Sequence, residues 1–250
     1  LAALAKEPVP EQVNVAYDET RLTFGREYII PKPFDPRLIS TIPVAVAQAA
    51  IASGVATEPI TDWIAYAEQL SSRLGNSQKM VRILHDRAKA APKRLIFAEA
   101  DHLDVLKAAQ IVYEEKIAVP ILLGNRAQIE KLRATLNFDD EVEVIDPKEE
   151  VYKEQRDLYA DLFWKDQRRK GYTLYDAQRL MRERNYFASM MIKNKDADAL
   201  ISGYSRNYPS VVKPILETTP RIKGVSKVAA ANLMLTKSGP LFLSDTTINV

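Results

Sequence analysis

The pattern of apolar and polar positions changes near residue 93, and the change predicts two kinds of structure. Before it, apolar residues recur at helical spacing over Thr41–Ala52 and again over Asp62–Leu74. Pro43 is expected in the opening turn of the first helix, where proline is tolerated. After it, from Lys93 onwards, short apolar runs alternate with amphipathic segments. The first part is therefore expected to be mainly helical and the second to contain a sheet.

The segment from Gly25 to Arg37 interrupts the helical part. It holds prolines at 31, 33 and 36, which remove backbone donors and push the preceding residues towards extended conformations. Its apolar residues are too numerous for a solvated linker. We predict an extended strap whose apolar side chains lie against a hydrophobic surface: Tyr28, Ile29, Ile30 and Phe34.

The apolar runs after residue 93 are typical of buried parallel strands. They lie at Leu95–Ala98, Val119–Leu123 and Ala199–Ser202, and Glu141–Ile145 alternates as a half-buried strand does. Helices between strands imply right-handed crossovers and a parallel sheet. The fold class is therefore α/β: a helical N-terminal part followed by a parallel α/β domain. Two further strands are expected at Val228–Leu235 and Leu241–Leu243.

Capping residues place the helices of the second part. Asp101 is expected to cap a helix over Leu103–Lys116, Asn125 to cap Ala127–Leu136, and Thr173 with Asp176 to form a capping box. The remaining helices are expected at Val151–Lys165, Tyr186–Lys193 and from Pro209 to about Thr218. Gly75-Asn76-Ser77 is the best candidate boundary, which gives an N-terminal part at 1–76, a linker helix at 77–92 and a domain at 93–250.

Charge is uneven along the chain. The net charge is +2, but residues 1–150 hold 18 Lys and Arg against 23 Asp and Glu (18 − 23 = −5), and residues 151–237 hold 17 against 9 (17 − 9 = +8). A basic segment suggests an anionic partner, with a solvated helix surface as the alternative. The chain has no cysteine, no secretory signal and no membrane-spanning run, as a cytoplasmic protein would. It lacks an initiator Met, so we expect a piece of something longer.

Candidate chemistry follows from the sheet, because ligands bind outside the carboxyl ends of parallel strands. That rule nominates Glu99 and Asp101, and more strongly Ser205, Arg206 and Asn207 at a helix start, where an anion could bind. The alternative is that Ser205 or Asn207 caps the helix and Arg206 is solvated. A second polar cluster follows the last apolar run and suits a polar ligand, an ion or a turn: Asp245, Thr246, Thr247 and Asn249.

Other site classes are disfavoured. The histidines His85 and His102 have no companion cysteine, so we predict no metal site in this chain. No glycine-rich phosphate loop is present, and aromatic residues do not interleave with the basic ones. Nucleic acid is therefore not an expected partner.

Two stretches carry a resemblance to a known family. Phe24 to Leu38 (FGREYIIPKPFDPRL) and Ala49 to Asp62 (AAIASGVATEPITD) are similar to the end of the NAD(P)-binding part of bacterial multidomain malic enzymes. From Lys93 the chain resembles the first part of a phosphotransacetylase domain, through Phe97-Ala98-Glu99, PILLG at 120–124, ADALISG at 197–203 and GPLFLSDTTIN at 239–249. In that order, the two halves resemble the junction in large, MaeB-type NADP-dependent malic enzymes.

The resemblance implies a parent enzyme that decarboxylates malate to pyruvate with NADP and a divalent metal, Mg or Mn, both held by an upstream malic-enzyme module. This chain would then be mainly a regulatory domain that senses acetyl-CoA and supports a homo-oligomer, without catalytic residues. Arg206 and Lys213 would hold the phosphates of the acyl-CoA. The alternative is an active phosphate acetyltransferase, although Ala100 replaces a glycine usual in that family. A third possibility is assembly alone, with Tyr152 to Phe163 at a subunit interface.

Overall fold

The computed structural model describes residues 1–7, 9–18, 22–73, 76–138, 141–221, 224–236 and 239–244. The chain forms two compact units, one made of Leu1–His85 with Ala229–Val250 and one of Asp86–Val228. The second unit contains the parallel sheet and the candidate site.

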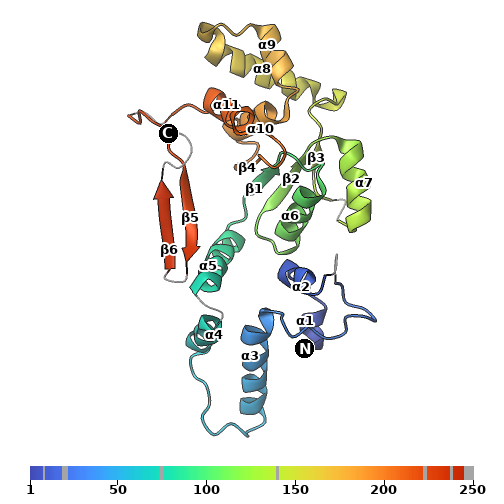
Figure 1. The fold of residues 1–250 in the computed structure, drawn as a ribbon, viewed down its shortest axis with the longest axis vertical. Coiled ribbons are helices and arrows are strands. Elements are labelled where there is room, and N and C mark those ends of the chain that lie inside the picture. The colour runs from blue at the N-terminus through green and yellow to red at the C-terminus, as the bar shows by residue number, and fades with distance from the viewer. Residues whose placement is uncertain are drawn as a thin grey trace. The chain divides into compact units, whose positions relative to one another are not determined.

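The sheet of the second unit has four parallel strands in the order β3-β2-β1-β4 (Figure 1). They are β1 (Arg94–Phe97), β2 (Val119–Leu123), β3 (Val144–Ile145) and β4 (Ala199–Ile201). The helices α6 (Leu103–Glu114) and α7 (Arg126–Leu136) connect the first three strands. The predicted parallel α/β architecture is confirmed in this unit.

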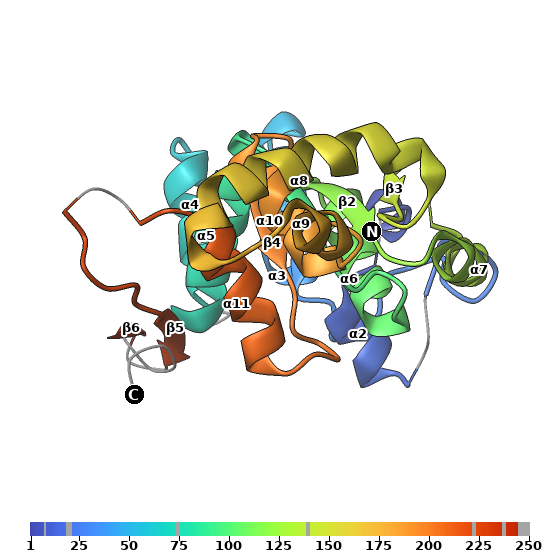
Figure 2. The same cartoon turned by 90° about the horizontal axis from the view of Figure 1, so that it is seen from above.

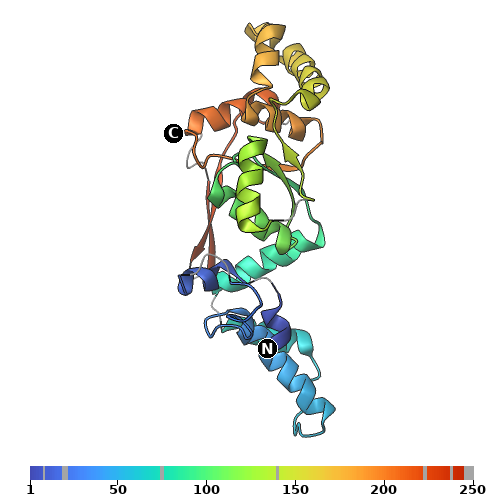
Figure 3. The same ribbon diagram turned by 90° about the vertical axis from the view of Figure 1, so that its right-hand side faces the viewer.

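Helices cover both faces of the sheet, because successive strand residues point to opposite sides. Phe97 and Leu122 pack with Leu106 of α6 and Ile129 of α7 on one face. Figures 1 and 3 show these two helices on the same side of the strands. Ile96 and Ile121, one residue earlier in their strands, point to the other face. Burial on both faces explains why the strand sequences are continuously apolar.

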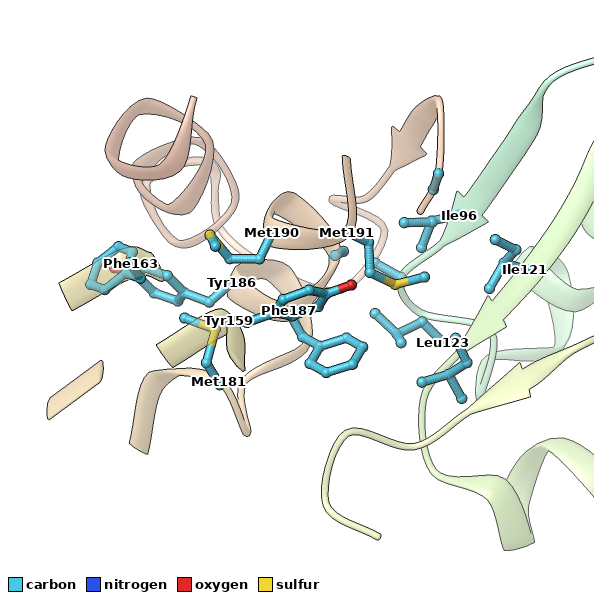
Figure 4. Packing of buried hydrophobic residues seen from close by; sticks show 14 of the residues in the cluster. Ile96, Ile121, Leu123, Tyr159, Phe163, Met181, Tyr186, Phe187, Met190 and Met191 are labelled. Carbon is cyan, nitrogen blue, oxygen red and sulfur yellow. The ribbon is translucent and has the colours of Figure 1, made fainter. Parts of the chain in front are cut away.

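The other face is covered by a helical layer with an aromatic core. Its elements are η1 (Glu150–Tyr152), α8 (Lys153–Gln167), η2 (Arg168–Lys170), α9 (Leu174–Leu180) and α10 (Arg184–Lys193). Phe187 packs against Tyr159 with 5.2 Å between ring centroids, and Phe163 meets Tyr186 edge-on at 5.7 Å (Figure 4). The helices α8 and α9 lie side by side in Figures 1 and 2. Tyr159 and Phe163 are thus buried within the unit itself.

Several local predictions in this unit hold and others fail. The capping box of Thr173 and Asp176 is present, and Asn125 accepts the Gln128 N–H as a cap of α7. Asp101 does not cap α6, since His102 occupies the cap position without a side-chain hydrogen bond. The expected strand over Glu141–Ile145 is reduced to β3. Because β4 is an edge strand among the described residues, Ile201 is 51% exposed rather than buried.

The helices of the first unit are α1 (Ala2–Ala5), α2 (Glu11–Ala16), α3 (Arg37–Ala52) and α4 (Trp63–Ser72), with α5 (Asn76–Ala90) at the division between the units. Pro43 lies in the interior of α3, not in its first turn. The helix begins earlier because the Asp35 carboxylate accepts hydrogen bonds from both the backbone N–H and the guanidinium of Arg37. No residue of α3 is buried, although its apolar residues recur at helical spacing. Ile64 of α4 is also exposed.

The proline segment is not one extended strap, because turns interrupt it at residues 25–28 and 32–35, and only one of its four apolar side chains is buried. Tyr28 packs with Ala5, Val13 and Leu22 and is 1% exposed. A tight pairing of Gly25 with Tyr28 turns the chain and directs this ring inward. The other three, Ile29, Ile30 and Phe34, are exposed, which corrects the prediction for them.

The last two predicted strands are present as an antiparallel pair outside the parallel sheet. They are β5 (Ala231–Thr236) and β6 (Gly239–Ser244). Apolar side chains from both strands are exposed: Leu233, Met234, Leu235, Leu241, Phe242 and Leu243.

Candidate functional site

The carboxyl ends of the strands of the second unit border a cavity of about 230 Å³. Gly124 and Asn125 follow β2, Asp146, Pro147 and Lys148 follow β3, and Arg206 follows β4. The turn between α9 and α10 completes the lining with Arg182, Glu183 and Arg184. The cavity therefore lies where the parallel topology predicts a ligand.

Glu99 organises the loop that follows β4. It lies just after β1, is 1% exposed, and accepts the backbone N–H groups of Gly203, Tyr204 and Ser205 at 2.7, 3.0 and 2.7 Å. The Ser205 hydroxyl donates to the same carboxylate. Burial alone would raise the pKa of Glu99, but these hydrogen bonds outweigh burial and lower the pKa to about 2. Glu99 is therefore an anion that binds the loop from within.

A second carboxylate fixes Arg184. Its guanidinium makes a two-pronged ion pair with Asp101, at 2.7 and 2.9 Å, and also donates to the Ala98 carbonyl. Burial raises the pKa of Asp101, while the hydrogen bonds and charge of Arg184 lower it, and the net shift is downward. Gly124 permits this pair, because a Cβ there would lie 3.2 Å from the Asp101 Cγ. Arg184 thus faces the cavity with its charge already compensated.

Contacts with neighbouring helices hold the loop after β4 at both sides. The Tyr204 hydroxyl donates to Asp104 of α6, and the Tyr204 ring lies 5.4 Å from that of His102. The Ser202 hydroxyl donates to the Asn185 side chain of α10 at 2.9 Å. These contacts fix the position of the loop shortly before Arg206.

Three cations at the cavity have no such partner. Lys148, Arg182 and Arg206 are exposed, and within the described part of the chain no hydrogen bond or ion pair engages their charged groups. The two carboxylates of the lining accept hydrogen bonds from backbone N–H groups: Asp146 from Lys148, and Glu183 from Asn185. The cavity thus has four cationic and two anionic side chains, a formal charge of 4 − 2 = +2.

The structure separates the residues of the first predicted cluster. Arg206 lines the cavity, Ser205 is engaged by Glu99, and Asn207 caps α11 (Tyr208–Thr218) by accepting the Ser210 N–H at 3.2 Å. Lys213 lies on α11 outside the cavity lining, 3.8 Å from Glu217. The second cluster, Asp245, Thr246, Thr247 and Asn249, lies outside the described residues.

The sequence did not single out Lys148, Arg182 or Arg184. Lys148 could have been found, because it follows a predicted strand just as Arg206 does. The two arginines lie in a helix–helix turn, and a rule based on strand ends does not reach them. Among the described residues no group of three or more His, Asp or Glu side chains could hold a metal ion.

Comparison with known proteins gives two kinds of relative. The profile of the family described as phosphate acetyl/butaryl transferase matches residues 79–250. NADP-dependent malic enzymes of Rhizobium meliloti (strain 1021) and Haemophilus influenzae are 34% and 37% identical to the chain. Each match covers 100% of this chain and 33% of the relative. The chain thus spans about one third of the length of these curated relatives.

A solved structure supports the α/β fold. The EutD phosphotransacetylase from Staphylococcus aureus superposes with a TM-score of 0.59 and 26% identity, over 69% of this chain and 52% of that one. None of the helices in the described ranges is long and apolar enough to cross a membrane.

Proposed function

Because this chain belongs to the phosphate acetyl/butaryl transferase family and is homologous over its whole length to bacterial NADP-dependent malic enzymes, we propose that it is the regulatory part of such an enzyme. In this proposal the parent protein is a cytoplasmic homo-oligomer that oxidises and decarboxylates malate to pyruvate. Residues 79–250 would sense acetyl-CoA and transmit its binding to an upstream malic-enzyme module.

The observation that supports the proposal is the cationic cavity at the carboxyl edge of the sheet. Arg206 reaches it from the loop after β4. A guanidinium binds phosphate through paired, charge-assisted hydrogen bonds, and an acyl-CoA has several phosphate groups. The described residues that line the cavity include four cations but no serine, threonine or cysteine, and the Ser205 hydroxyl donates to Glu99. This chemistry fits binding better than group transfer.

NADP and a divalent metal belong to the proposal only through the parent enzyme. The described residues offer no cluster for a metal, and the sequence has no glycine-rich phosphate loop for a dinucleotide. We therefore assign neither group to residues of this chain.

The first test is calorimetric titration of acetyl-CoA into the chain at low and high salt. We expect saturable binding that weakens with salt and is lost or reduced at least tenfold in Arg206→Ala. Arg169→Ala is the matched control, because Arg169 is an exposed arginine outside the cavity. In the full-length protein, R206A should relieve inhibition of malate oxidation by acetyl-CoA. Unchanged binding and inhibition in R206A would contradict the proposed site.

The alternative is an active phosphate acetyltransferase, which the family match and the EutD structure favour. One local feature opposes it. Ala100, at a position where the resemblance implies a glycine, is fully buried and packs with Phe97 and Leu106, so the loop after β1 has a buried methyl group at that residue. Formation of acetyl phosphate from acetyl-CoA and phosphate by the full-length protein would favour the enzyme; its absence, with acetyl-CoA binding retained, would favour regulation.

A further inference from the structure

Three separate segments bring an unpaired cation to the cavity. Lys148 follows β3, Arg182 lies in the turn before α10, and Arg206 follows β4. Among the described residues, the charged groups of all three lack an ion-pair or hydrogen-bond partner. Three like charges around one cavity repel one another, and a bound anion would remove that cost.

The remaining charged groups of the cavity form no ion pair with these cations. Arg184 is committed to Asp101 in a two-pronged ion pair. Asp146 and Glu183 accept backbone N–H groups, which fixes their orientation within their own turns. Asp146 and Glu183 keep their negative charges, so the lining has a formal charge of +2, and the three unpaired cations are the groups free to contact an anion.

The backbone amides of residues 203–205 cannot serve as the anion site. In many phosphate sites such N–H groups hold the ligand. Here the N–H groups of residues 203–205 are already directed at Glu99, 2.7 to 3.0 Å from its oxygens. With these three amides occupied, the side-chain cations of the lining are the groups that we expect to hold an incoming anion. Two arginines with planar donor pairs and one lysine as a point charge suit a phosphate dianion better than a single carboxylate.

We propose that Lys148, Arg182 and Arg206 form a phosphate clamp, a site for the dianionic phosphate or pyrophosphate group of a small-molecule ligand. This inference rests on the proposed function for the location of the ligand, and it adds Lys148 and Arg182 as binding residues. The phosphate could be free or could belong to a coenzyme A thioester. The same clamp chemistry would serve both.

The test is calorimetric titration of this chain with inorganic pyrophosphate, coenzyme A and 3′-dephospho-coenzyme A, in buffer with EDTA. The variants are K148A, R182A and R206A, with R169A and K170A as controls, because Arg169 and Lys170 are neighbouring exposed cations outside the cavity. Each clamp variant should bind pyrophosphate about tenfold or more weakly, as expected for loss of one charge-assisted contact. The controls should bind as the unmodified chain does.

Comparing the three ligands distinguishes failure of the phosphate clamp from failure of the proposed function. Pyrophosphate binding that depends on all three cations, without binding of coenzyme A, keeps the clamp and overturns the acyl-CoA proposal. Coenzyme A binding that is unchanged in K148A and R182A overturns the clamp and keeps the proposal. Weaker binding of the 3′-dephospho form places the 3′-phosphate in the clamp, and equal binding places the pyrophosphate there. Absence of pyrophosphate and coenzyme A binding, or equal losses in the controls, overturns the clamp.

Discussion

Glu99 and Ser205, 106 positions apart in the chain, are joined by two hydrogen bonds. The Ser205 N–H and hydroxyl both donate to the Glu99 carboxylate. This relationship connects the end of β1 to the loop after β4 and fixes the residue before Arg206. The buried Glu99 carboxylate thus helps to position Arg206 at the cavity.

The first prediction is that Glu99→Gln destabilises the second unit by roughly 2–3 kcal/mol at pH 7, because an amide cannot accept all the hydrogen bonds that the carboxylate accepts. The pKa of Glu99 in the fold is about 2, below the ordinary value of about 4.3. Its stabilisation is therefore complete above the ordinary value and is lost as the pH falls from about 5 towards 2. Urea unfolding across that window measures the effect.

The control is the pH slope itself. The unmodified chain should lose more stability than E99Q between pH 5 and pH 2. Parallel curves for the two proteins would show that Glu99 is not held as an anion by the loop.

The second prediction concerns Gly124. Its substitution by Ala would place a Cβ 3.2 Å from the Asp101 Cγ and 3.3 Å from the Asp101 N, so the Asp101–Arg184 pair must shift. We expect a loss of about 1–3 kcal/mol in unfolding free energy. Gly25→Ala is the control, since the nearest atom to its Cβ lies 3.9 Å away. Equal stability of G124A and the unmodified chain would contradict the close packing.

The third prediction concerns two tyrosines that share one carboxylate. The hydroxyls of Tyr172 and Tyr186 donate to the two oxygens of Glu217, at 2.8 and 2.6 Å, and tie α11 to the helical layer. Burial, followed by the hydrogen bond to Glu217, raises the pKa of both tyrosines. Their stabilisation is present below the ordinary tyrosine pKa of about 10 and is lost as the pH rises further.

The double variant Y172F/Y186F should therefore cost about 1–3 kcal/mol at pH 7 and show a smaller loss of stability above pH 10 than the unmodified chain. Tyr175→Phe is the control, because Tyr175 is 73% exposed. A steep alkaline loss that persists unchanged in the double variant would mean that other groups cause it.

Local sequence patterns predicted the elements of the second unit more reliably than the contacts between them. Val119–Leu123 was predicted to the residue, and the capping box of Thr173 and Asp176 depends only on a three-residue spacing. Asp101 was misassigned as a helix cap because its true partner, Arg184, lies 83 positions away. A capping rule that reads only neighbouring residues cannot anticipate that competition.

The candidate site was predictable in position but only partly in composition. Arg206 was found because it follows a predicted strand, and parallel strands share one carboxyl edge. Arg182 was missed because it reaches that edge from a helix–helix turn, whose position depends on how α9 and α10 pack. In the first unit, the exposure of Phe34 was missed because its apolar character predicts burial without specifying which surface covers it.

The last prediction uses Asp101 to change the charge of the cavity. Asn at this position keeps the shape of the side chain but removes the charge that compensates Arg184. The chain should lose about 1–3 kcal/mol of stability, as when one partner of a half-buried ion pair is removed. Arg184 would then add a fourth uncompensated cation at the cavity. Pyrophosphate should consequently bind about threefold to tenfold more tightly to D101N, the gain expected from one added charge near the surface.

Calorimetry at low salt measures this affinity. The matched control is Asp157→Asn, because Asp157 lies on the exposed face of α8. Tighter binding in D101N but not in D157N supports an anion site governed by the charge of this cavity, whereas unchanged or weaker binding in folded D101N contradicts it.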